Sequence, residues 1–336
     1  MTKKQITSII LTICIVLTGL LGIRTEVLAG TVTPAPFEFE YQYSDYYQGI
    51  EILKYTGNDA DISIPATIEG QSVTAIGAMA FIKCETLRTV TVPDSVQVMG
   101  AGAFELCSSL ENVTLPQNLK EIPMDLFFHC PKLKAVTIPD GVTKIGNSAF
   151  SGCKSLTGIK LPSSVISLGS SVFAGCTKLK KITFASGSRL ETIDEQCFSN
   201  CKALKSITLP ASLKKLAPHT FSRSYLKTIH INKNAKITVL PDECFANCYG
   251  LQEVDIPKNV TKIGKDMFVF DLNMKKEYLN KVKKINIMGS RVKLLGKDSF
   301  QGIHKKAVFS VPSKFKTKYQ RLLKKQSWYK ASMKIR

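Results

Sequence analysis

A repeat of 23 residues constrains this chain more than any other feature of its sequence. Five cysteines stand 23 residues apart, and a phenylalanine lies three residues before each of them. An Ile, Leu or Met precedes each phenylalanine by five residues, and this register continues almost to the end of the chain. It places ten phenylalanines in equivalent positions: Phe81, Phe104, Phe127, Phe150, Phe173, Phe198, Phe221, Phe245, Phe268 and Phe300. A period of this length predicts a solenoid of about ten stacked coils.

Each repeat contains a segment in which apolar residues alternate, usually closed by proline. In one unit these residues are Leu156, Ile159, Leu161 and Pro162. Alternation predicts a strand with one buried face, and proline ends it because proline cannot donate to a ladder. We therefore predict one parallel strand per coil, with a second short extended piece that returns the chain. A glycine such as Gly146 then allows a tight turn into a short helical or 3-10 step that carries the Phe and Cys.

The unit at Ile145–Pro162, IGNSAFSGCKSLTGIKLP, resembles the BspA-like leucine-rich-repeat surface proteins of bacteria. The resemblance extends from about Gly49 to the C-terminus. It implies a mainly β leucine-rich-repeat solenoid opened by a β-hairpin, for which the residues Ile52–Gly57 and Ile62–Pro65 are the candidates. It also implies adhesion and binding to extracellular matrix, which are known for some members of the family.

The C-terminal end predicts a strand and a helix that close the last coil. A strand would end at Pro312, and Ser313 is placed to cap the helix that follows. The spacing of Phe315, Tyr319, Leu322 and Leu323 is that of one apolar helix face. The domain prediction is a signal peptide at 1–29, an N-terminal segment with the capping hairpin at 30–70, the solenoid at 71–303 and a basic cap at 304–336.

Some segments depart from the repeat and leave its local register and curvature open. Non-cysteine residues occupy the Cys position at Ser224, Asp271 and Ile303. Longer linkers lie at Ala185–Arg189 and Asn232–Lys236, and an insertion occupies 272–281.

The first 29 residues have the pattern of a secretory signal peptide. Lys3 and Lys4 precede an apolar run from Ile6 to Ile23, and Val27 and Ala29 stand before a cleavage point. We predict cleavage and an exported or cell-surface protein that is not transmembrane afterwards; an uncleaved anchor is the alternative.

The cysteines are predicted to be buried free thiols. Equivalent residues of adjacent coils project in parallel, so their Cβ atoms do not converge as a disulfide requires. The pairs Cys197/Cys201 and Cys244/Cys248 lie two coils apart, too far for one zinc ion. Four histidines stand in different coils, and the common catalytic motifs are missing from the sequence. We predict no enzymatic activity, metal or cofactor.

The outward strand positions are the candidate binding surface. A repeat solenoid presents such positions as an extended concave sheet. Threonine also suits any exposed strand, so the breaks in the threonine pattern are the more informative positions. The candidates are Thr91, Thr114, Thr137, Lys160, Lys181, Thr183, Thr208, His230, Glu253 and Asp255.

The positive charge of the chain is concentrated at its C-terminal end. Residues 272–336 hold 19 basic and two acidic side chains, whereas the formal charge of the whole chain is +20. Such a field attracts polyanions, although plain solvation also explains it. The candidate polyanion contacts are Lys314, Lys316, Lys318, Arg321, Lys324 and Lys325.

We therefore expect a secreted or surface protein without enzymatic activity that binds an extracellular protein or glycan through its sheet. The alternative is a structural cell-wall protein, retained by its basic C-terminal region on an anionic wall polymer without a specific ligand. Nucleic acid is not an expected partner.

Overall fold

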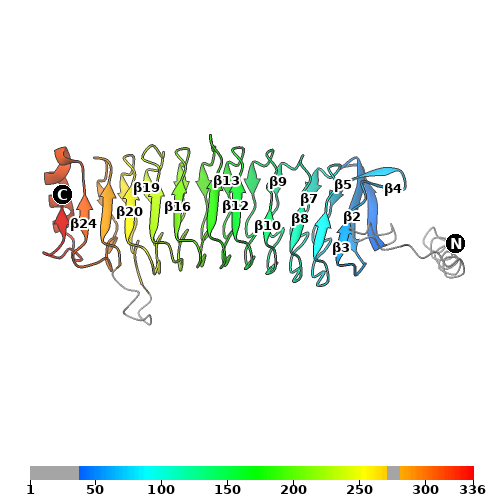
Figure 1. The fold of residues 1–336 in the computed structure, drawn as a ribbon. Helices are drawn as coiled ribbons and strands as arrows, with labels where there is room; N and C mark the ends of the chain where they lie inside the picture. The colour runs from blue at the N-terminus through cyan, green and yellow to red at the C-terminus, as the bar shows by residue number, and fades with distance from the viewer. Residues whose placement is uncertain (1–37, 271–280) are drawn as a thin grey trace, which may run out of the picture. The chain divides into compact units, whose positions relative to one another are not determined.

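The computed structural model describes residues 38–270 and 281–336 as a stack of short coils (Figure 1). The predicted signal peptide lies outside the described residues, and so does all of the insertion except Lys281. Within the described residues the structure is mainly β, with one α-helix, α2 (Lys316–Lys324), directly after the short 3-10 helix η3 (Ser313–Phe315). The predicted β solenoid is confirmed.

The predicted strand of each coil forms the first face of the solenoid, and neighbouring strands in it are parallel. Its strands pair in three runs, which separate between β10 and β12 and between β14 and β16. The strands are β3 (Asp61–Ser63), β6 (Thr89–Thr91), β8 (Asn112–Thr114), β10 (Ala135–Val136), β12 (Gly158–Leu161), β14 (Lys181–Phe184), β16 (Ser206–Leu209), β18 (Thr228–Ile231), β20 (Glu253–Ile256), β22 (Lys284–Ile287), β24 (Val308–Ser310) and β25 (Lys334–Ile335).

The returning piece of each coil is a second strand, where we had predicted one strand per coil. These strands form their own parallel ladders, which we call the second face. They are β5 (Gln71–Ile76), β7 (Val98–Met99), β9 (Glu121–Ile122), β11 (Lys144–Ile145), β13 (Ser167–Leu168), β15 (Thr192–Ile193), β17 (Lys215–Leu216), β19 (Val239–Leu240), β21 (Lys262–Ile263) and β23 (Leu294–Leu295).

The segment that carries each phenylalanine is a run of turns, not the helical or 3-10 step that we predicted. Around Phe150, Ser148 has φ 52° and Gly152 has φ 76°, so right-handed helix cannot continue through them. The N–H groups of these three residues donate to carbonyls of the next coil over 2.8–2.9 Å. The intervening N–H groups bond within their own turn. We call this segment the turn ladder; its inter-coil N–H groups face the C-terminal end of the stack.

The repeated glycine is required by the closeness of two coils and not by a turn with positive φ. A Cβ on Gly146 would lie 2.5 Å from the backbone nitrogen of Met124 in the preceding coil. Gly264 meets Asp242 in the same way, at 2.4 Å. Neither glycine has a positive φ. The turn explanation offered from the sequence is therefore wrong, and the reason for glycine is backbone packing between neighbours.

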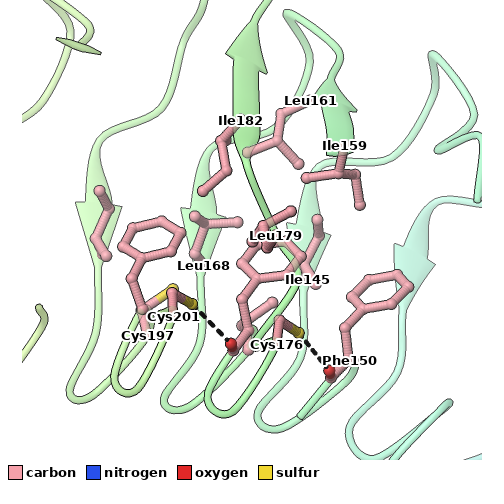
Figure 2. Close-up of a cluster of buried hydrophobic side chains, with 14 of the residues drawn as sticks. Ile145, Phe150, Ile159, Leu161, Leu168, Cys176, Leu179, Ile182, Cys197 and Cys201 are labelled. Carbon is pink, nitrogen blue, oxygen red and sulfur yellow. Dashed lines mark hydrogen bonds between the residues drawn. The ribbon is translucent and has the colours of Figure 1, made fainter. Parts of the chain in front are cut away.

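The phenylalanines and the thiols run through the core side by side. Successive phenylalanine rings from Phe81 to Phe300 lie 4.9 to 5.9 Å apart between centroids. Thiols donate to the carbonyl of the phenylalanine one coil earlier, as from Cys176 to Phe150 at 3.1 Å and from Cys201 to Phe173 at 3.2 Å (Figure 2). Each thiol thus adds a second donor to a carbonyl that already accepts an N–H within its own turn, as Phe150 does from Cys153. The cysteines of the described residues are free thiols, as predicted, and all but the half-buried Cys84 are buried.

The N-terminal hairpin exists, but its strands differ from those predicted. Strand β1 (Phe39–Ser44) pairs antiparallel with β2 (Gly49–Tyr55). The segment around Ile62 instead forms β3 and starts the first face, beside β6. A further short strand, β4 (Thr67–Ile68), pairs antiparallel with β5. Phe39 and Tyr55 cover Phe81, with centroids 6.3 and 5.4 Å from its ring.

The C-terminal cap contains the predicted strand and helix, with three differences. Phe315 is 37% exposed and is not part of the buried helix face, which consists of Tyr319 and Leu323. Ser313 makes no capping hydrogen bond, because the 3-10 helix η3 precedes α2. After the helix the chain returns as β25, which the sequence did not predict, and Trp328 packs 5.2 Å from Phe300.

Candidate functional site

The predicted surface residues lie in two adjacent columns on the first face. Residues one coil apart are Cα partners, as in the pairs Thr91 with Thr114, Lys160 with Thr183, and Thr208 with His230. The first column continues through Asp255 to Asn286. Within each paired run, the parallel pairing therefore places these residues in register from one coil to the next.

The N-terminal part of the first column is a plain stripe of threonine. Thr91 is half-buried, and Thr114 and Thr137 are exposed. Thr137 directly follows β10 and is not part of the strand. No hydrogen bond of these three hydroxyls is present in the described structure. The stripe fits the preference of threonine for an exposed strand.

The C-terminal part of the column is different, because charged side chains bond to one another across three strands. His230 Nδ1 lies 2.8 Å from Asp255 Oδ2. Asn286 Nδ2 donates to Asp255 Oδ1 at 2.6 Å and to Glu253 Oε1 at 2.7 Å. Lys284 Nζ lies 2.6 Å from the same oxygen of Glu253. We call these five residues, on β18, β20 and β22, the polar cluster.

The electrostatics of the polar cluster hold it in one arrangement. Asp255 is only 7% exposed, and each of its oxygens has a partner. The hydrogen bond from Lys284 is the main reason that the pKa of Glu253 lies below its usual value, and the same contact raises the pKa of Lys284. A buried carboxylate requires such partners. The cluster is therefore a prearranged patch of donors and acceptors.

Together with Lys284, whose side chain is 52% exposed, His230 is a member of the polar cluster that faces solvent. Its side chain is 49% exposed, against 9% for the side chain of Asp255. Because Nδ1 is bonded to the carboxylate, Nε2 is the ring nitrogen left to meet a partner. The hydrogen bond with Asp255 therefore orients the imidazole ring of His230, and Nε2 remains available to a partner.

Two members of the polar cluster, Lys284 and Asn286, were not predicted. They follow the insertion at 272–281, which displaces the next repeat. The alternation around Ile285 and Ile287, read back from the Phe300 register, was the signal that could have located them. What the sequence could not supply was the hydrogen bond that joins Asn286 to both carboxylates.

A pocket of about 720 Å³ opens beside the polar cluster, between β14 and β16. Three predicted residues, Lys181, Thr183 and Thr208, line it, whereas Lys160 does not. Phe184 and the linker residue Ser188 are among the other residues that line it. The first face is unpaired at this point, so the longer linker creates a hollow in an otherwise regular surface.

The side chains at this surface provide several kinds of hydrogen-bonding and charged groups. The pocket and the polar cluster offer ammonium, imidazole, amide, hydroxyl and carboxylate groups. No hydroxyl or thiol is hydrogen-bonded to His230 in the described residues. In residues 38–270 and 281–336 no group of three or more His, Cys, Asp and Glu side chains is placed to hold a metal ion.

The predicted polyanion contacts lie on and around α2. The side chains of Lys314, Lys316, Arg321, Lys324 and Lys325 are exposed. Lys318 is instead engaged with the carbonyl of Ser290, and its ammonium lies 5.5 Å from the centre of the Tyr319 ring. For the part of the chain that is described, the helices include none long and apolar enough to span a bilayer.

Comparison with known families identifies the repeat. The family described as "BspA type Leucine rich repeat region" matches residues 74–189 and 176–291, with six copies of its unit. The two matches together cover more than half of the chain. A comparison with curated proteins finds no match.

Solved structures with similar coils come from several bacteria. A leucine-rich repeat protein from Bacteroides ovatus is 20% identical, with 92% of this chain and 99% of that chain covered and a TM-score of 0.49. The T. pallidum leucine-rich repeat protein is 23% identical, with coverages of 89% and 100% and a TM-score of 0.45. The pneumococcal vaccine antigen PcpA is 20% identical, with coverages of 79% and 75% and a TM-score of 0.43.

Proposed function

Because the chain belongs to the BspA-type leucine-rich repeat family, we propose that it is a surface or secreted protein that binds a partner through its first face. Proteins with BspA-type repeats are typically surface proteins involved in binding, and their solenoid is typically a scaffold without catalysis. The specific proposal is that β14 to β22 contact an extracellular protein or glycan.

The polar cluster is the observation that carries this proposal. A strand column that served only to cover the core would continue as threonine, as it does at Thr91 and Thr114. At His230 and Asp255 it changes to charged groups that are fixed by hydrogen bonds across coils. Fixed polar groups favour recognition because little side-chain freedom is lost on binding.

The neighbouring pocket supports a partner that reaches below the sheet surface. Pockets of roughly 300–1,000 Å³ hold small molecules or single groups of a larger one. The pocket walls combine the ammonium of Lys181 and the hydroxyls of Thr183 and Thr208 with the apolar side chain of Phe184. That mixture suits a sugar unit or an exposed protein side chain.

Binding to immobilised glycans and extracellular-matrix proteins tests the proposal. The test variant is Lys181→Ala/Thr208→Ala/His230→Ala. The matched control is Thr91→Ala/Thr114→Ala, which removes two side chains from the same column far from the polar cluster. We expect the test variant to lose binding at least about tenfold and the control to keep it, with circular dichroism showing both folded. Equal binding by the test variant and the parent would contradict the proposal.

Export is part of the proposal, and it rests on residues 1–29. The charged and apolar pattern there supports secretion to the cell surface. N-terminal sequencing of the protein from its own cells should then begin at about Gly30. A mature protein that keeps Met1 would favour an uncleaved anchor.

Retention by the basic cap is the second candidate. Its support is the group of exposed lysines and one arginine, Arg321, on and beside α2, for which no ion pair is present among the described residues. If these side chains tether the protein to an anionic wall polymer, washing cells with increasing salt should release it, because screening shortens the range of attraction. Retention that does not change between about 50 and 500 mM salt would contradict this tether.

A further inference from the structure

We propose that copies of this chain bind one another end to end, with the N-terminal end of one solenoid against the C-terminal end of the next. The partner at each end is therefore a second copy of this chain. The contact uses neither the polar cluster nor the pocket beside it, so it does not depend on the proposed binding at the first face.

The two ends of the stack carry opposite charge. The acidic end, which we define as residues 38–76, holds seven acidic side chains and one basic one, a net charge of −6. The basic end, defined as residues 281–336, holds 17 basic side chains and one acidic one, a net charge of +16. The strand order places the first segment at one end of the stack and the second at the other (Figure 1).

The separation of the two ends lets each act as a local charge. Neighbouring strands lie about 4.8 Å apart, so the first face from β3 to β25 extends over roughly 50 Å. That is several times the screening length of about 8 Å at physiological salt. Two opposite ends in contact therefore attract each other, although the whole chain has a net charge of +20.

Many of these charges have no partner within their own chain. At the acidic end, Glu40 pairs with Lys54 and Asp61 pairs with Arg88. The other acidic side chains of this end form no ion pair within the described residues: Glu38, Asp45, Glu51, Asp59 and Glu69. The exposed basic side chains on and beside α2 are likewise unpaired in the described part of the chain. Both ends thus hold charges that a second copy can pair.

Each end also exposes large apolar side chains beside its charges. At the acidic end Tyr43 is 51% exposed and Tyr46, in the turn of the hairpin, is 87% exposed. At the basic end Leu294 is 61% exposed and Phe315 is 37% exposed. Lysine and arginine bind the faces of tyrosine rings, and aromatic side chains are enriched in protein interfaces. The composition of the two ends is therefore that of a contact surface.

The strands at the ends of the second face are open edges. Strand β1 pairs only with β2, and β23 pairs only with β21, within the described residues. An open edge is a template for pairing with another chain. Like charges keep two identical ends apart, whereas opposite charges bring different ends together. The contact is therefore head to tail, and such contacts add copies in a row unless the rotation between copies closes a ring.

The mass of the protein in solution tests this proposal. The chain is purified from the cells that make it and measured alone, by light scattering and sedimentation, so that an anionic wall polymer cannot contribute. We expect the average mass to rise with concentration between about 10 µM and 1 mM, the range of a weak contact. It should return to the mass of one chain in about 0.5 M salt, because screening weakens the attraction. A single-chain mass at low salt throughout this range would overturn the proposal.

Two variants, each with one end altered, identify the direction of the contact. Asp45→Lys/Glu69→Lys alters the acidic end, and Lys314→Glu/Lys316→Glu/Arg321→Glu alters the basic end. Each variant alone should associate at least about tenfold more weakly than the parent. An equimolar mixture should form pairs that grow no further, because each pair uses the one intact acidic end and the one intact basic end. A mixture that stays as single chains would overturn the head-to-tail contact.

A matched control separates the ends from the total charge. Asp140→Lys/Glu195→Lys makes the same change of charge at two exposed residues of interior coils. It should associate as the parent does, with circular dichroism showing all variants folded. Equal weakening by this control and by the acidic-end variant would contradict the proposal. The first-face variant that contains His230→Ala should associate normally, so a failure of first-face binding and a failure of association are distinguishable.

Discussion

At the scale of single residues, the residue types that recur in the repeat are required for physical reasons other than those the sequence suggested. Gly146 suggested a turn, yet its backbone does not have positive φ, and the neighbouring coil leaves no room for a Cβ. Positive φ occurs instead at ordinary residues such as Ser148, where the inter-coil hydrogen bonds hold it. Packing between coils therefore decides what each position tolerates.

A pair of glycine substitutions tests this reading. In Gly146→Ala the new methyl group meets the Met124 backbone at 2.5 Å, so one coil must shift. We expect a loss of about 1–3 kcal/mol in the free energy of unfolding. In Gly158→Ala the nearest atom, the Lys181 carbonyl oxygen, is 3.5 Å away. That control should be neutral or gain up to about 1 kcal/mol. Denaturant unfolding measures both, and equal losses would contradict the packing argument.

At the scale of elements, both ends of the solenoid are closed by aromatic side chains. Each coil buries its apolar face against its neighbours, so an uncovered end would expose the phenylalanine row. The β1–β2 hairpin covers Phe81 with Tyr55, and the cap covers Phe300 with Trp328. Strand β25 then adds a last strand to the first face by pairing with β24.

The cap can be tested by comparing two aromatic residues that lie close in sequence. Trp328→Ala removes a buried ring from the end of the phenylalanine row, and we expect a loss of about 3–5 kcal/mol. Phe315→Ala removes a ring that is 37% exposed and should change stability by less than about 1 kcal/mol. Thermal unfolding followed by circular dichroism compares them. A Phe315 effect as large as that of Trp328 would mean that the cap is assigned wrongly.

At the scale of the whole molecule, the effects of equivalent side chains add up, because each coil places the same kind of group in the same surroundings. Burial is the main cause of the raised pKa of six thiols. For Cys153, Cys201 and Cys248 the pKa is raised to about 12. The pKa values of Cys176, Cys197 and Cys244 also lie well above the usual 9.0. Below pH 9 the thiols are protonated in both states, so they do not change stability with pH. Above it the unfolded chain loses protons that the folded chain keeps.

The solenoid should therefore lose stability as the pH rises above about 9. Each such thiol lowers the free energy of unfolding by up to about 1.4 kcal/mol per pH unit between its unfolded and folded pKa. Denaturant unfolding under reducing conditions at pH 8 and pH 10 measures the loss. The variant Cys201→Ala, with one thiol fewer, should show a smaller slope. Equal stability at the two pH values would contradict burial of the thiols in the folded state.

The sequence by itself determined the repeat, the core and the register. Equal spacing stacks equivalent residues whatever lies between them. The Phe and Cys rows and the column that holds Thr208 and His230 could therefore be found by counting residues. The alternating segment Phe39–Ser44 was also readable as a strand, although we did not predict it. These features are periodic, and a periodic pattern can be read from the sequence without knowing which distant residues are in contact.

Only the tertiary structure decided which contacts neighbouring coils make with one another. Three contacts illustrate this: Asn286 bonding to Asp255 across an insertion, the pairing of β25 with β24, and the approach that excludes a Cβ at Gly146. Each depends on distances between backbones that the stack sets after it has formed. The physical reason is that a repeat specifies which residues are neighbours, whereas the bonds between their side chains depend on how closely those neighbours approach.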